Sequence, residues 1–302
     1  MSYAALRTVV QTSRPPFLLL ALSAVFLSLG IVCLDGISWD IATAGLITLA
    51  AVLGHIAVNM HNEYCDHKSK LDFVTTKTPF SGGSGALQQN QGAESLILWL
   101  SLISLGLACA IGFYFVVNSS MPFLLVALGI FSIGLVLLYT PFLNRFPLLC
   151  LLAPGFGFGG AITIGSYVVL TEQLSTNSVL LGVFMAMVAN NLLLLNQVPD
   201  ATSDKAHGRN HWVIRYGIRS AGSVYLLQWL IGLFILIWVF VSNPINPWLA
   251  LALVPFLLGL IVGITFLTVD SASQLTHSTM AMNVICAVVT PALLGGALCV
   301  VV

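Results

Sequence analysis

Long apolar segments separated by short polar connections make up most of the chain. A membrane-spanning helix needs about 20 mostly apolar residues, and nine stretches meet this requirement without a single Asp, Glu, Lys or Arg. They are residues 17–34, 41–61, 95–117, 121–140, 148–170, 178–198, 221–242, 248–269 and 279–301. The pattern predicts an all-α integral membrane protein whose consecutive helices pack antiparallel, because the connections are short. No connection is long enough for a separate soluble domain, so we expect one domain over residues 1–302.

The composition agrees with a protein that has lipid as its solvent. Charged residues make up 7% of the chain and hydrophobic residues 58%, whereas a soluble domain has roughly 25% charged residues. The formal net charge is zero, which argues against nucleic acid as a partner. The six cysteines are scattered without a CxxC pair and are interpreted as small buried hydrophobes. We expect no cleavable signal peptide, because the first apolar run begins near Phe17 and further spans follow it.

The positive charges all fall on one side of the predicted bundle. They lie before the first span and after the second, fourth and sixth: Arg7, Arg14, Lys68, Lys70, Lys77, Arg145, Lys205, Arg209, Arg215 and Arg219. The opposite connections hold Asp35, Asp40 and Glu172 and no cation. Cytoplasmic loops of membrane proteins carry an excess of Lys and Arg. We therefore expect a cytoplasmic N-terminus and, after nine spans, a C-terminus outside.

Two polar stretches interrupt the apolar pattern. Residues 59–85 read NMHNEYCDHKSKLDFVTTKTPFSGGSG, and residues 196–219 read NQVPDATSDKAHGRNHWVIRYGIR. Within them, Asn62–Lys77 and Asp200–Arg219 hold 12 of the 20 charged residues. The first stretch follows the second span and the other follows the sixth, so both emerge on the same face. Their carboxylates can therefore meet.

Each stretch places carboxylates and an amide at helical spacing. Asn62 and Asp66 are four residues apart, on one face of a helix, and Asp72 is within reach if the chain turns after Lys70. In the second stretch, Asn196, Asp200 and Asp204 follow one another at intervals of four. Pro199 removes a backbone donor and disfavours helix at the residue before it. We therefore expect the sixth helix to kink or restart there.

This set of oxygen ligands is typical of a magnesium site. Carboxylate and amide oxygens bind Mg²⁺, which also shares phosphate oxygens. Facing aspartates without a cation between them would repel one another, and a divalent metal removes that conflict. Lys77, Arg145, Lys205 and Arg209 are candidates to neutralise a bound diphosphate. The run Ser81–Gly85 is either a backbone cradle for its oxygens or only a flexible loop.

The two stretches together resemble the two aspartate-rich motifs of the UbiA superfamily of intramembrane prenyltransferases. The matching segments are NEYCDHKSKLD (62–72) and NQVPDATSDKAHGR (196–209), with Arg14-Pro15 before the first span and Tyr139-Thr140-Pro141 at the end of the fourth. The first motif's spacing and the glycines of the fifth span resemble the 1,4-dihydroxy-2-naphthoate branch, which makes menaquinone precursors. This chain departs from the family pattern in having Asn144-Arg145, Glu63 and Pro199.

The resemblance implies nine helices around a central cavity that opens to the cytoplasmic face of a bacterial or archaeal cell membrane. It implies an isoprenyl diphosphate donor, an aromatic acceptor and diphosphate release, with surrounding membrane lipids. Two Mg²⁺ ions would be held by Asn62, Asp66, Asp72, Asn196, Asp200 and Asp204, with Asp66 and Asp200 essential for turnover. Lys77, Tyr139, Arg145, Lys205 and Arg209 would bind substrate.

Three other classes remain open at this point. A multi-span transporter with a metal or anion site suits broken helices and polar residues inside spans. A membrane di-iron oxidase needs many histidines, and only His207 and His211 form an HxxxH pair. A structural membrane protein would have no use for two matched polar motifs.

Polar residues within or beside the predicted spans have two interpretations. They include His55, Asn59, Asn190, Asn191, Gln228, His277 and Asn283. Such residues more often bridge helices than take part in chemistry, although Asn190 and Asn191 are placed where they could orient an acceptor. Gly155 and Gly159 have the GxxxG spacing of close helix packing.

Overall fold

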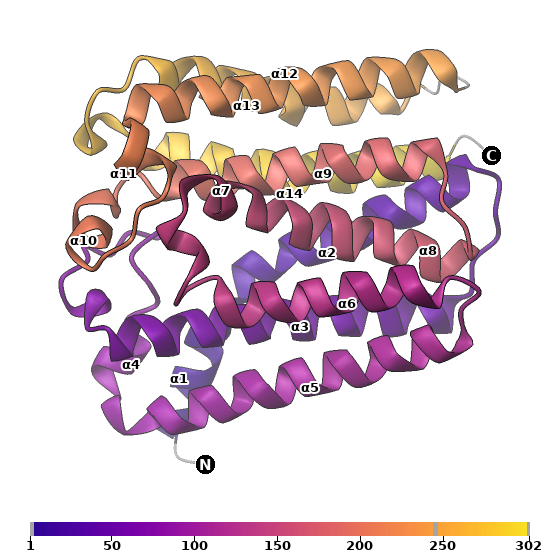
Figure 1. Ribbon diagram of the computed structural model, residues 1–302. Coiled ribbons are helices and arrows are strands. Elements are labelled where there is room, and N and C mark those ends of the chain that lie inside the picture. Colours follow the sequence, from indigo (N-terminus) through magenta and orange to yellow (C-terminus); the bar gives the residue numbers. More distant parts are fainter. Residues whose placement is uncertain (1–2, 244–246, 301–302) are drawn as a thin grey trace.

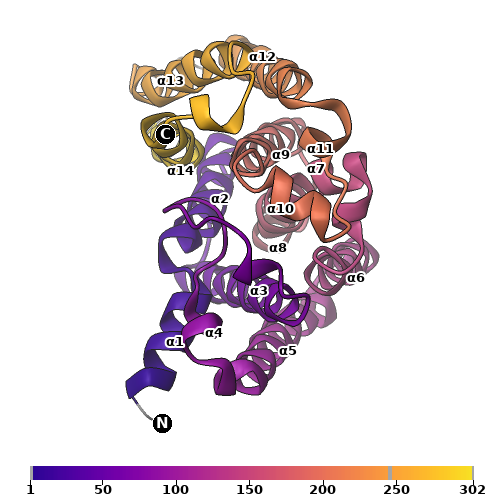
Figure 2. The same ribbon diagram turned by 90° about the vertical axis from the view of Figure 1, so that its left-hand side faces the viewer.

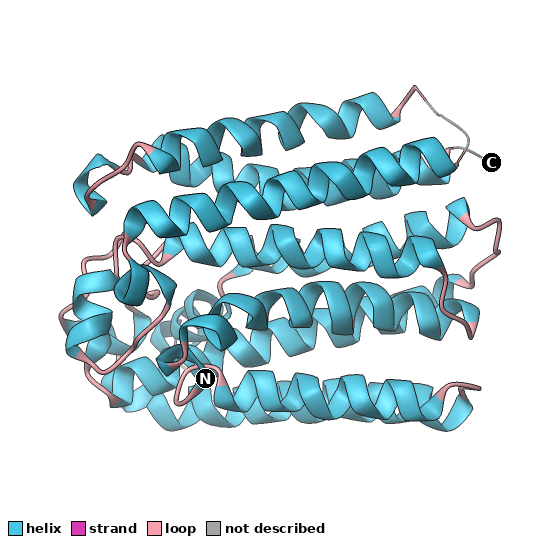
Figure 3. Cartoon of the chain, turned by 45° about the horizontal axis from the view of Figure 1, so that its top comes forward, coloured by secondary structure: helices cyan, strands magenta, loops and turns pink. Residues whose placement is uncertain are grey.

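Every element of regular structure in residues 3–243 and 247–300, the part of the chain described by this computed structural model, is a helix (Figure 3). The longer elements are α1 (Tyr3–Ser13), α2 (Pro15–Leu34), α3 (Ile41–Lys68), α5 (Glu94–Asn118), α6 (Pro122–Leu138), α7 (Pro147–Gly155), the π-helix η4 (Phe156–Ile164), α8 (Gly165–Thr171), α9 (Thr176–Asn196), α12 (Ile218–Ser242), α13 (Leu249–Leu267) and α14 (His277–Cys299). The connections contain η1 (Leu71–Phe73), α4 (Ala86–Gln89), η2 (Gln91–Ala93), η3 (Leu143–Arg145), α10 (Ala201–Ala206), α11 (Trp212–Tyr216) and η5 (Ala272–Gln274). The expected all-α fold is confirmed.

Eight helical runs among the described residues are long and apolar enough to cross a membrane. They coincide with eight of the predicted stretches. The remaining stretch, residues 121–140, forms α6, an apolar helix of 17 residues. Val301, where the last predicted stretch ends, lies outside the described residues.

Local sequence signals account for many of the helix ends. Pro122 and Pro147 open α6 and α7 at the first helical position, where the missing N–H has no partner to lose. The Asp40 carboxylate accepts a hydrogen bond of 2.7 Å from the Thr43 N–H and caps α3. Ser175 and Ser178 form a capping box at the start of α9.

The long helices run side by side, and the short helices gather at one end of the bundle. In Figure 1 this end lies on the left, with α1, α4, α10 and α11, and Figure 2 looks at the same end directly. Helix α3 packs against α5, α14 packs between α2 and α13, and α9 packs against α12 and η4. Both motif-bearing connections therefore leave the bundle at the same end.

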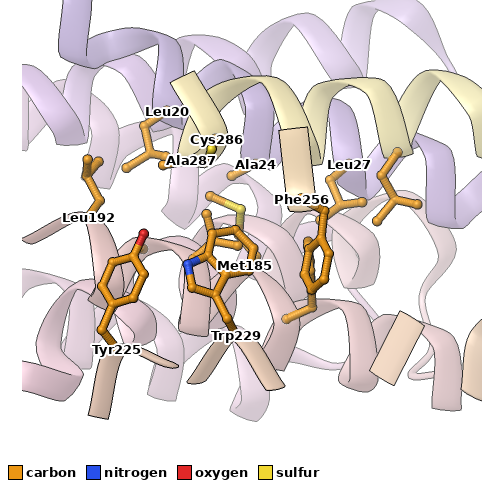
Figure 4. Packing of buried hydrophobic residues seen from close by; sticks show 14 of the residues in the cluster. Leu20, Ala24, Leu27, Met185, Leu192, Tyr225, Trp229, Phe256, Cys286 and Ala287 are labelled. Atoms are coloured by element: carbon orange, nitrogen blue, oxygen red, sulfur yellow. The ribbon is translucent and has the colours of Figure 1, made fainter. Parts of the chain in front are cut away.

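The main hydrophobic core lies where α2, α9, α12, α13 and α14 meet (Figure 4). The Trp229 ring of α12 meets the edge of Phe256 from α13, with ring centroids 4.8 Å apart and planes at 82°. Gly259 makes room for this indole, because a Cβ there would lie 2.4 Å from the Trp229 ring. Dispersion contacts of this kind hold helices together where lipid weakens the hydrophobic effect.

The fifth predicted span is a continuous helical run with a π-helix in its middle. Gly159 of this π-helix packs on Gly182 of α9, where an added Cβ would lie 2.2 Å from the Gly182 carbonyl oxygen. The predicted close packing at this glycine is therefore present. Gly157 faces the other way and lines the cavity described below. The same run of glycines thus supports both tight packing and an open space.

Candidate functional site

A cavity of about 660 Å³ runs between α3, α5, α6, η4 and α9. Most of its wall is apolar, with side chains such as Ile47, Leu128 and Leu192. Its polar side chains concentrate where the two motif stretches leave the bundle. Those at this end are Arg14, Asn59, Asn62, Asp66, Asp72, Thr75, Ser81, Tyr139, Asn144, Asn196, Gln197, Asp200, Asp204, Arg209 and His211, while the mostly apolar remainder also contains His55, Ser132 and Ser166. The cavity therefore has one charged end and a long apolar remainder.

Helix α3 carries the first motif to the charged end. The helix continues past residue 61 to Lys68, so Asn62 and Asp66 lie on its last two turns and face the cavity. The chain then turns at Lys70, whose φ is +63°, and η1 brings Asp72 back beside the cavity. The Asn62 amide oxygen accepts a hydrogen bond of 3.0 Å from Thr140 Oγ and keeps a second lone pair free.

The second motif is divided at Pro199, as the sequence predicts. Helix α9 ends at Asn196, and α10 begins at Ala201 after a turn. The break lets Asn196, Asp200 and Asp204 all line the cavity. The prediction of a kink or a restart is thus resolved in favour of a restarted helix.

Arg209 joins the two motifs. Its guanidinium pairs with Asp66 of the first motif, and its Nη1 lies 3.0 Å from Asp204 Oδ1 of the second. His211 Nε2 lies 3.1 Å from the other oxygen of Asp204. Both carboxylates are buried, so the pairing offsets the cost of desolvating them. The two stretches thus form one site, although Asp66 and Arg209 are 143 positions apart in the sequence.

The glycine-rich run folds over this site. Gly82 and Gly83 adopt φ values of +82° and +74°, which favour glycine, and a Cβ on Gly83 would lie 2.6 Å from Asp72 Oδ1. The Gly82 N–H donates a hydrogen bond of 3.0 Å to Asp200 Oδ2. The run is thus an ordered connection between the motifs.

Glu63 anchors that connection to the helix bundle. It is 1% exposed, and its carboxylate accepts hydrogen bonds from the Ser84 N–H at 2.8 Å and from Ser84 Oγ at 2.7 Å. Arg14, before α2, donates from Nε to the same carboxylate at 2.9 Å. In the sequence analysis, Arg14 belongs to the family pattern and Glu63 is a departure from it. The sequence contains no signal for their pairing, because the residues are 49 positions apart.

Three buried oxygens at the charged end have no hydrogen-bond partner among the described residues. They belong to Asp72, Asn196 and Asp200 and come from both motifs. Burial and the carboxylates of Glu63 and Asp66 raise the pKa of Asp72 to about 7. Burial and Asp204 raise the pKa of Asp200 to about 6. Unpartnered oxygens on carboxylates that resist ionisation are what a bound cation would satisfy.

The donor set fits Mg²⁺ only with help from other ligands. Among the described residues, no three His, Cys, Asp or Glu side chains converge closely enough to hold a metal ion. One reason is that Arg209 occupies the space between Asp66 and Asp204. Mg²⁺ usually keeps several waters and shares substrate phosphate oxygens, so it does not require a closed cage of protein ligands.

The other sequence-predicted residues lie at different depths. Tyr139 lines the cavity, and its hydroxyl lies 3.3 Å from Cys150 Sγ. Lys77, Arg145 and Lys205 are exposed and are not part of the cavity wall. The Lys77 amine lies over the glycine-rich run, where a Cβ on Gly85 would be 2.3 Å from it.

Polar residues deeper in the bundle mostly bridge helices. Asn190 accepts a hydrogen bond of 2.7 Å from the Gly155 N–H and donates one of 3.0 Å to Gln228. Gln228 in turn donates to Asn191 at 2.9 Å. Both asparagines are therefore occupied in holding α7, α9 and α12 together, which leaves them poorly placed to orient an acceptor.

Comparison with known proteins agrees with the fold and the motifs. A sequence profile of the UbiA prenyltransferase family matches residues 21–285. Over 201 residues the chain is 27% identical to the 1,4-dihydroxy-2-naphthoate octaprenyltransferase of Bacillus subtilis (strain 168). That match covers 64% of the chain and 61% of the relative, so the chain spans about three fifths of the length of the curated relative that it matches.

Solved structures share the whole architecture. A UbiA homolog from Archaeoglobus fulgidus bound to DMAPP and Mg²⁺ superposes with a TM-score of 0.68 at 12% identity, covering 98% of this chain and 100% of that one. The apo structure of a UbiA homolog from Aeropyrum pernix K1 gives a TM-score of 0.68 at 15% identity, covering 93% and 97%. The family profile spans most of the chain, and the paired aspartate motifs lie at one end of a bundle that contains eight long apolar helical runs. The chain is therefore an integral membrane protein of the UbiA prenyltransferase family.

Proposed function

We propose that the protein transfers an isoprenyl chain from a polyprenyl diphosphate to an aromatic acceptor of the quinone-precursor type. The observation that carries this proposal is the set of unpartnered buried oxygens of Asp72, Asn196 and Asp200 at the charged end of a mostly apolar cavity. The name of the B. subtilis relative and the DMAPP and Mg²⁺ bound to the A. fulgidus homolog support the same reaction class.

Two Mg²⁺ ions would be held by the six oxygen donors of the motifs: Asn62, Asp66, Asp72, Asn196, Asp200 and Asp204. Bound Mg²⁺ draws charge from the diphosphate as its bond to the allylic carbon breaks. Asp66 and Asp200, one from each motif, are the residues whose loss we expect to abolish turnover. Asp66 is buried and Asp200 is half-buried, which limits the access of competing water to the site.

The cations of this end bind the diphosphate in our proposal. Arg209 lines the cavity and is the cation nearest to both motifs. Lys77 lies over the glycine-rich run, while Arg145 and Lys205 are exposed at the same end and attract the anionic donor toward it. Tyr139, on the cavity wall, faces the leaving group or the allylic cation.

The apolar remainder of the cavity accommodates the prenyl chain and the acceptor ring. Its walls exclude water, which would otherwise capture an allylic cation. We further propose nine membrane-crossing helices in one domain, with α6 as the shortest, and a cavity that opens to the cytoplasm. In this orientation the N-terminus and all the cations named above lie on the cytoplasmic side.

A transfer assay with purified protein in detergent tests the proposal. Geranyl diphosphate (GPP) is supplied as the donor together with Mg²⁺. The acceptors are supplied in turn: 1,4-dihydroxy-2-naphthoate, 4-hydroxybenzoate and homogentisate. We expect a prenylated aromatic product, identified by mass, together with diphosphate release that EDTA stops and Mg²⁺ restores. A protein that binds Mg²⁺ and GPP but prenylates none of these acceptors would contradict the aromatic part of the proposal. Absence of any Mg²⁺-dependent diphosphate release would contradict prenyl transfer and would favour the alternative of a membrane transporter.

A further inference from the structure

Helix α3 presents an unused imidazole to the apolar part of the cavity. His55 lines the cavity on the same helix as Asn62 and Asp66. At 100° per residue, these three side chains fall within an arc of about 40° on one helical face. With a rise of 1.5 Å per residue, His55 lies about 10 Å farther along the axis than Asn62. The imidazole therefore lies about two helical turns deeper than Asn62, with Asn59 of the charged end one turn away from it.

The surroundings of His55 offer it no polar partner. The side chain is 9% exposed, and no hydrogen bond joins it to the described residues. Its ring meets Phe158 of η4 edge-on, with centroids 5.1 Å apart and planes at 77°. A buried polar group without a partner is unfavourable, so its presence here calls for a ligand that supplies the missing hydrogen bond.

Several other buried polar side chains have at least one hydrogen-bond partner. His211, the second histidine of the cavity wall, bonds Asp204 through Nε2, while its Nδ1 has no partner among the described residues. Asn190, Gln228 and Asn191 satisfy one another in the bundle interior. Of the cavity residues with an unpartnered buried atom, only His55 lies outside the charged end in the described part of the chain.

The chemistry of the two substrates decides between possible partners. This step rests on the proposed function. The diphosphate of the donor belongs at the motifs, and the rest of the donor is a hydrocarbon chain that offers an imidazole no hydrogen bond. The aromatic acceptor carries hydroxyl groups on a flat ring. Such a ring packs well against Phe158 and Leu192, and its hydroxyl can donate to a neutral imidazole nitrogen.

We propose that His55 binds a hydroxyl group of the aromatic acceptor and so sets the position of the ring relative to the prenyl donor. The separation of about 10 Å from Asn62 leaves room for the first carbon of the donor and for the reacting ring in between. A hydroxyl that donates to nitrogen also makes the ring richer in electrons, which favours its attack on the allylic carbon. His55 is thus assigned to acceptor recognition, separate from the donor and metal site.

Substitutions of His55 separate acceptor binding from donor binding. His55→Phe keeps a ring of similar size but removes the hydrogen bond, and His55→Gln keeps a hydrogen-bonding group. His61→Leu is the matched control, because His61 lies on the same helix but is not part of the cavity wall. The KM values for GPP and for 1,4-dihydroxy-2-naphthoate are measured for each protein. A thermal shift with Mg²⁺ and GPP verifies that each variant is folded and binds donor.

We expect His55→Phe to raise the acceptor KM about tenfold, equivalent to about 1.4 kcal/mol, with the donor KM within about twofold of wild type. We expect His55→Gln to restore most of the loss and His61→Leu to behave as wild type. Inhibition constants of 1-hydroxy-2-naphthoate and 4-hydroxy-2-naphthoate add a second readout. Removal of the hydroxyl that His55 binds weakens inhibition of the wild type but not of His55→Phe.

The outcomes distinguish this inference from the proposed function. If the wild type prenylates the naphthoate and His55→Phe leaves its KM unchanged, the assignment of His55 is wrong while the proposed function stands. An equal rise in both KM values would also overturn the assignment. Should His55→Phe fail the thermal-shift test, His55→Leu takes its place in both measurements, and a hydroxyl dependence identical to that of the wild type would overturn the assignment. If the wild type prenylates no aromatic compound, both proposals are wrong.

Discussion

The backbone N–H of Gly82 donates a hydrogen bond to Asp200 Oδ2 across 3.0 Å, although the two residues are 118 positions apart. This bond closes the glycine-rich run of the first motif over the carboxylate of the second. It leaves the other oxygen of Asp200 buried and without a partner among the described residues. The bond therefore holds Oδ2 of Asp200 toward the loop and leaves Oδ1 for a ligand.

Replacing Gly82 with alanine should disrupt this arrangement. Its φ is +82°, and a Cβ would lie 2.7 Å from the Thr76 carbonyl oxygen. We expect the activity, measured as kcat/KM for the donor, to fall at least tenfold, because a displacement of about 1 Å is costly at a reacting centre. Gly36→Ala is the control, since Gly36 has a φ of +68° but open space around it at the other end of the bundle. Equal effects of the two substitutions would show that backbone strain alone is responsible.

Asp200→Asn should abolish turnover while preserving the fold. The amide keeps the size of the side chain and can still accept the hydrogen bond from Gly82, but it carries no charge for Mg²⁺. We expect kcat to fall by a factor of about 10³ or more. The check is product formation, together with gel filtration and thermal unfolding in detergent. Asp270→Asn, at an exposed residue that pairs with Arg219, serves as control. Activity near that of the wild type in Asp200→Asn would contradict the proposed role.

The ion pair of Arg14 and Glu63 should matter chiefly for stability. Arg14→Met leaves the Glu63 carboxylate buried with hydrogen bonds from Ser84 alone. Loss of one partner of a buried pair typically costs about 3 kcal/mol or more, so we expect a clear fall in the thermal unfolding midpoint. Adding Glu63→Gln removes the uncompensated charge and should recover part of the loss. A double variant as unstable as the sum of the single variants would show that the two residues are independent.

Stability without metal should decrease as the pH rises. Asp72 and Asp200 have pKa values of about 7 and about 6, above the ordinary value of 3.8. Their contribution to the stability of the folded protein is fully present below about pH 4, where both carboxyl groups are protonated in the folded and the unfolded state. It is lost as the pH rises through 6 and 7. We expect the unfolding midpoint in EDTA to be lower at pH 8 than at pH 5.5, with part of this difference absent in Asp72→Asn.

Addition of Mg²⁺ and inorganic diphosphate should reverse this trend. Protons compete with the metal for the same oxygens, so metal affinity rises as the carboxyl groups ionise. We expect the thermal stabilisation by these ligands to be small at pH 5.5 and to develop between pH 6 and pH 8. Stabilisation that is equal at both pH values would mean that the metal does not bind to these carboxylates.

The sequence predicted the helices well because a helix that crosses a membrane must have a minimum length and an almost entirely apolar composition. Predicted and observed ends of most spans differ by a few residues. The exception is α3, which continues from residue 61 to Lys68. Hydropathy assigned those residues to a loop, since they are polar. They remain helical because Asn62 and Asp66 face the polar end of the cavity and are not exposed to lipid.

The sequence pointed to several residues that line the charged end of the cavity, but not to their pairings. Spacing placed Asp66 and Asp200 on one face of the membrane, and both line one cavity. Spacing does not reveal that Arg209 would pair with Asp66 and Asp204, or that Glu63 would hold Ser84. These contacts depend on how loops fold over the bundle, and each joins residues that have no periodic relation. His55 likewise looked like any polar residue inside a span until its surroundings were visible.

The position of Arg209 also bears on how the protein rests between catalytic cycles. Facing carboxylates without a cation between them would repel one another and destabilise the site. Here a tethered positive charge from the protein's own chain lies between Asp66 and Asp204. Under the proposed function, Mg²⁺ binding would exchange one cation for another, and the carboxylates would keep their arrangement in the metal-free protein.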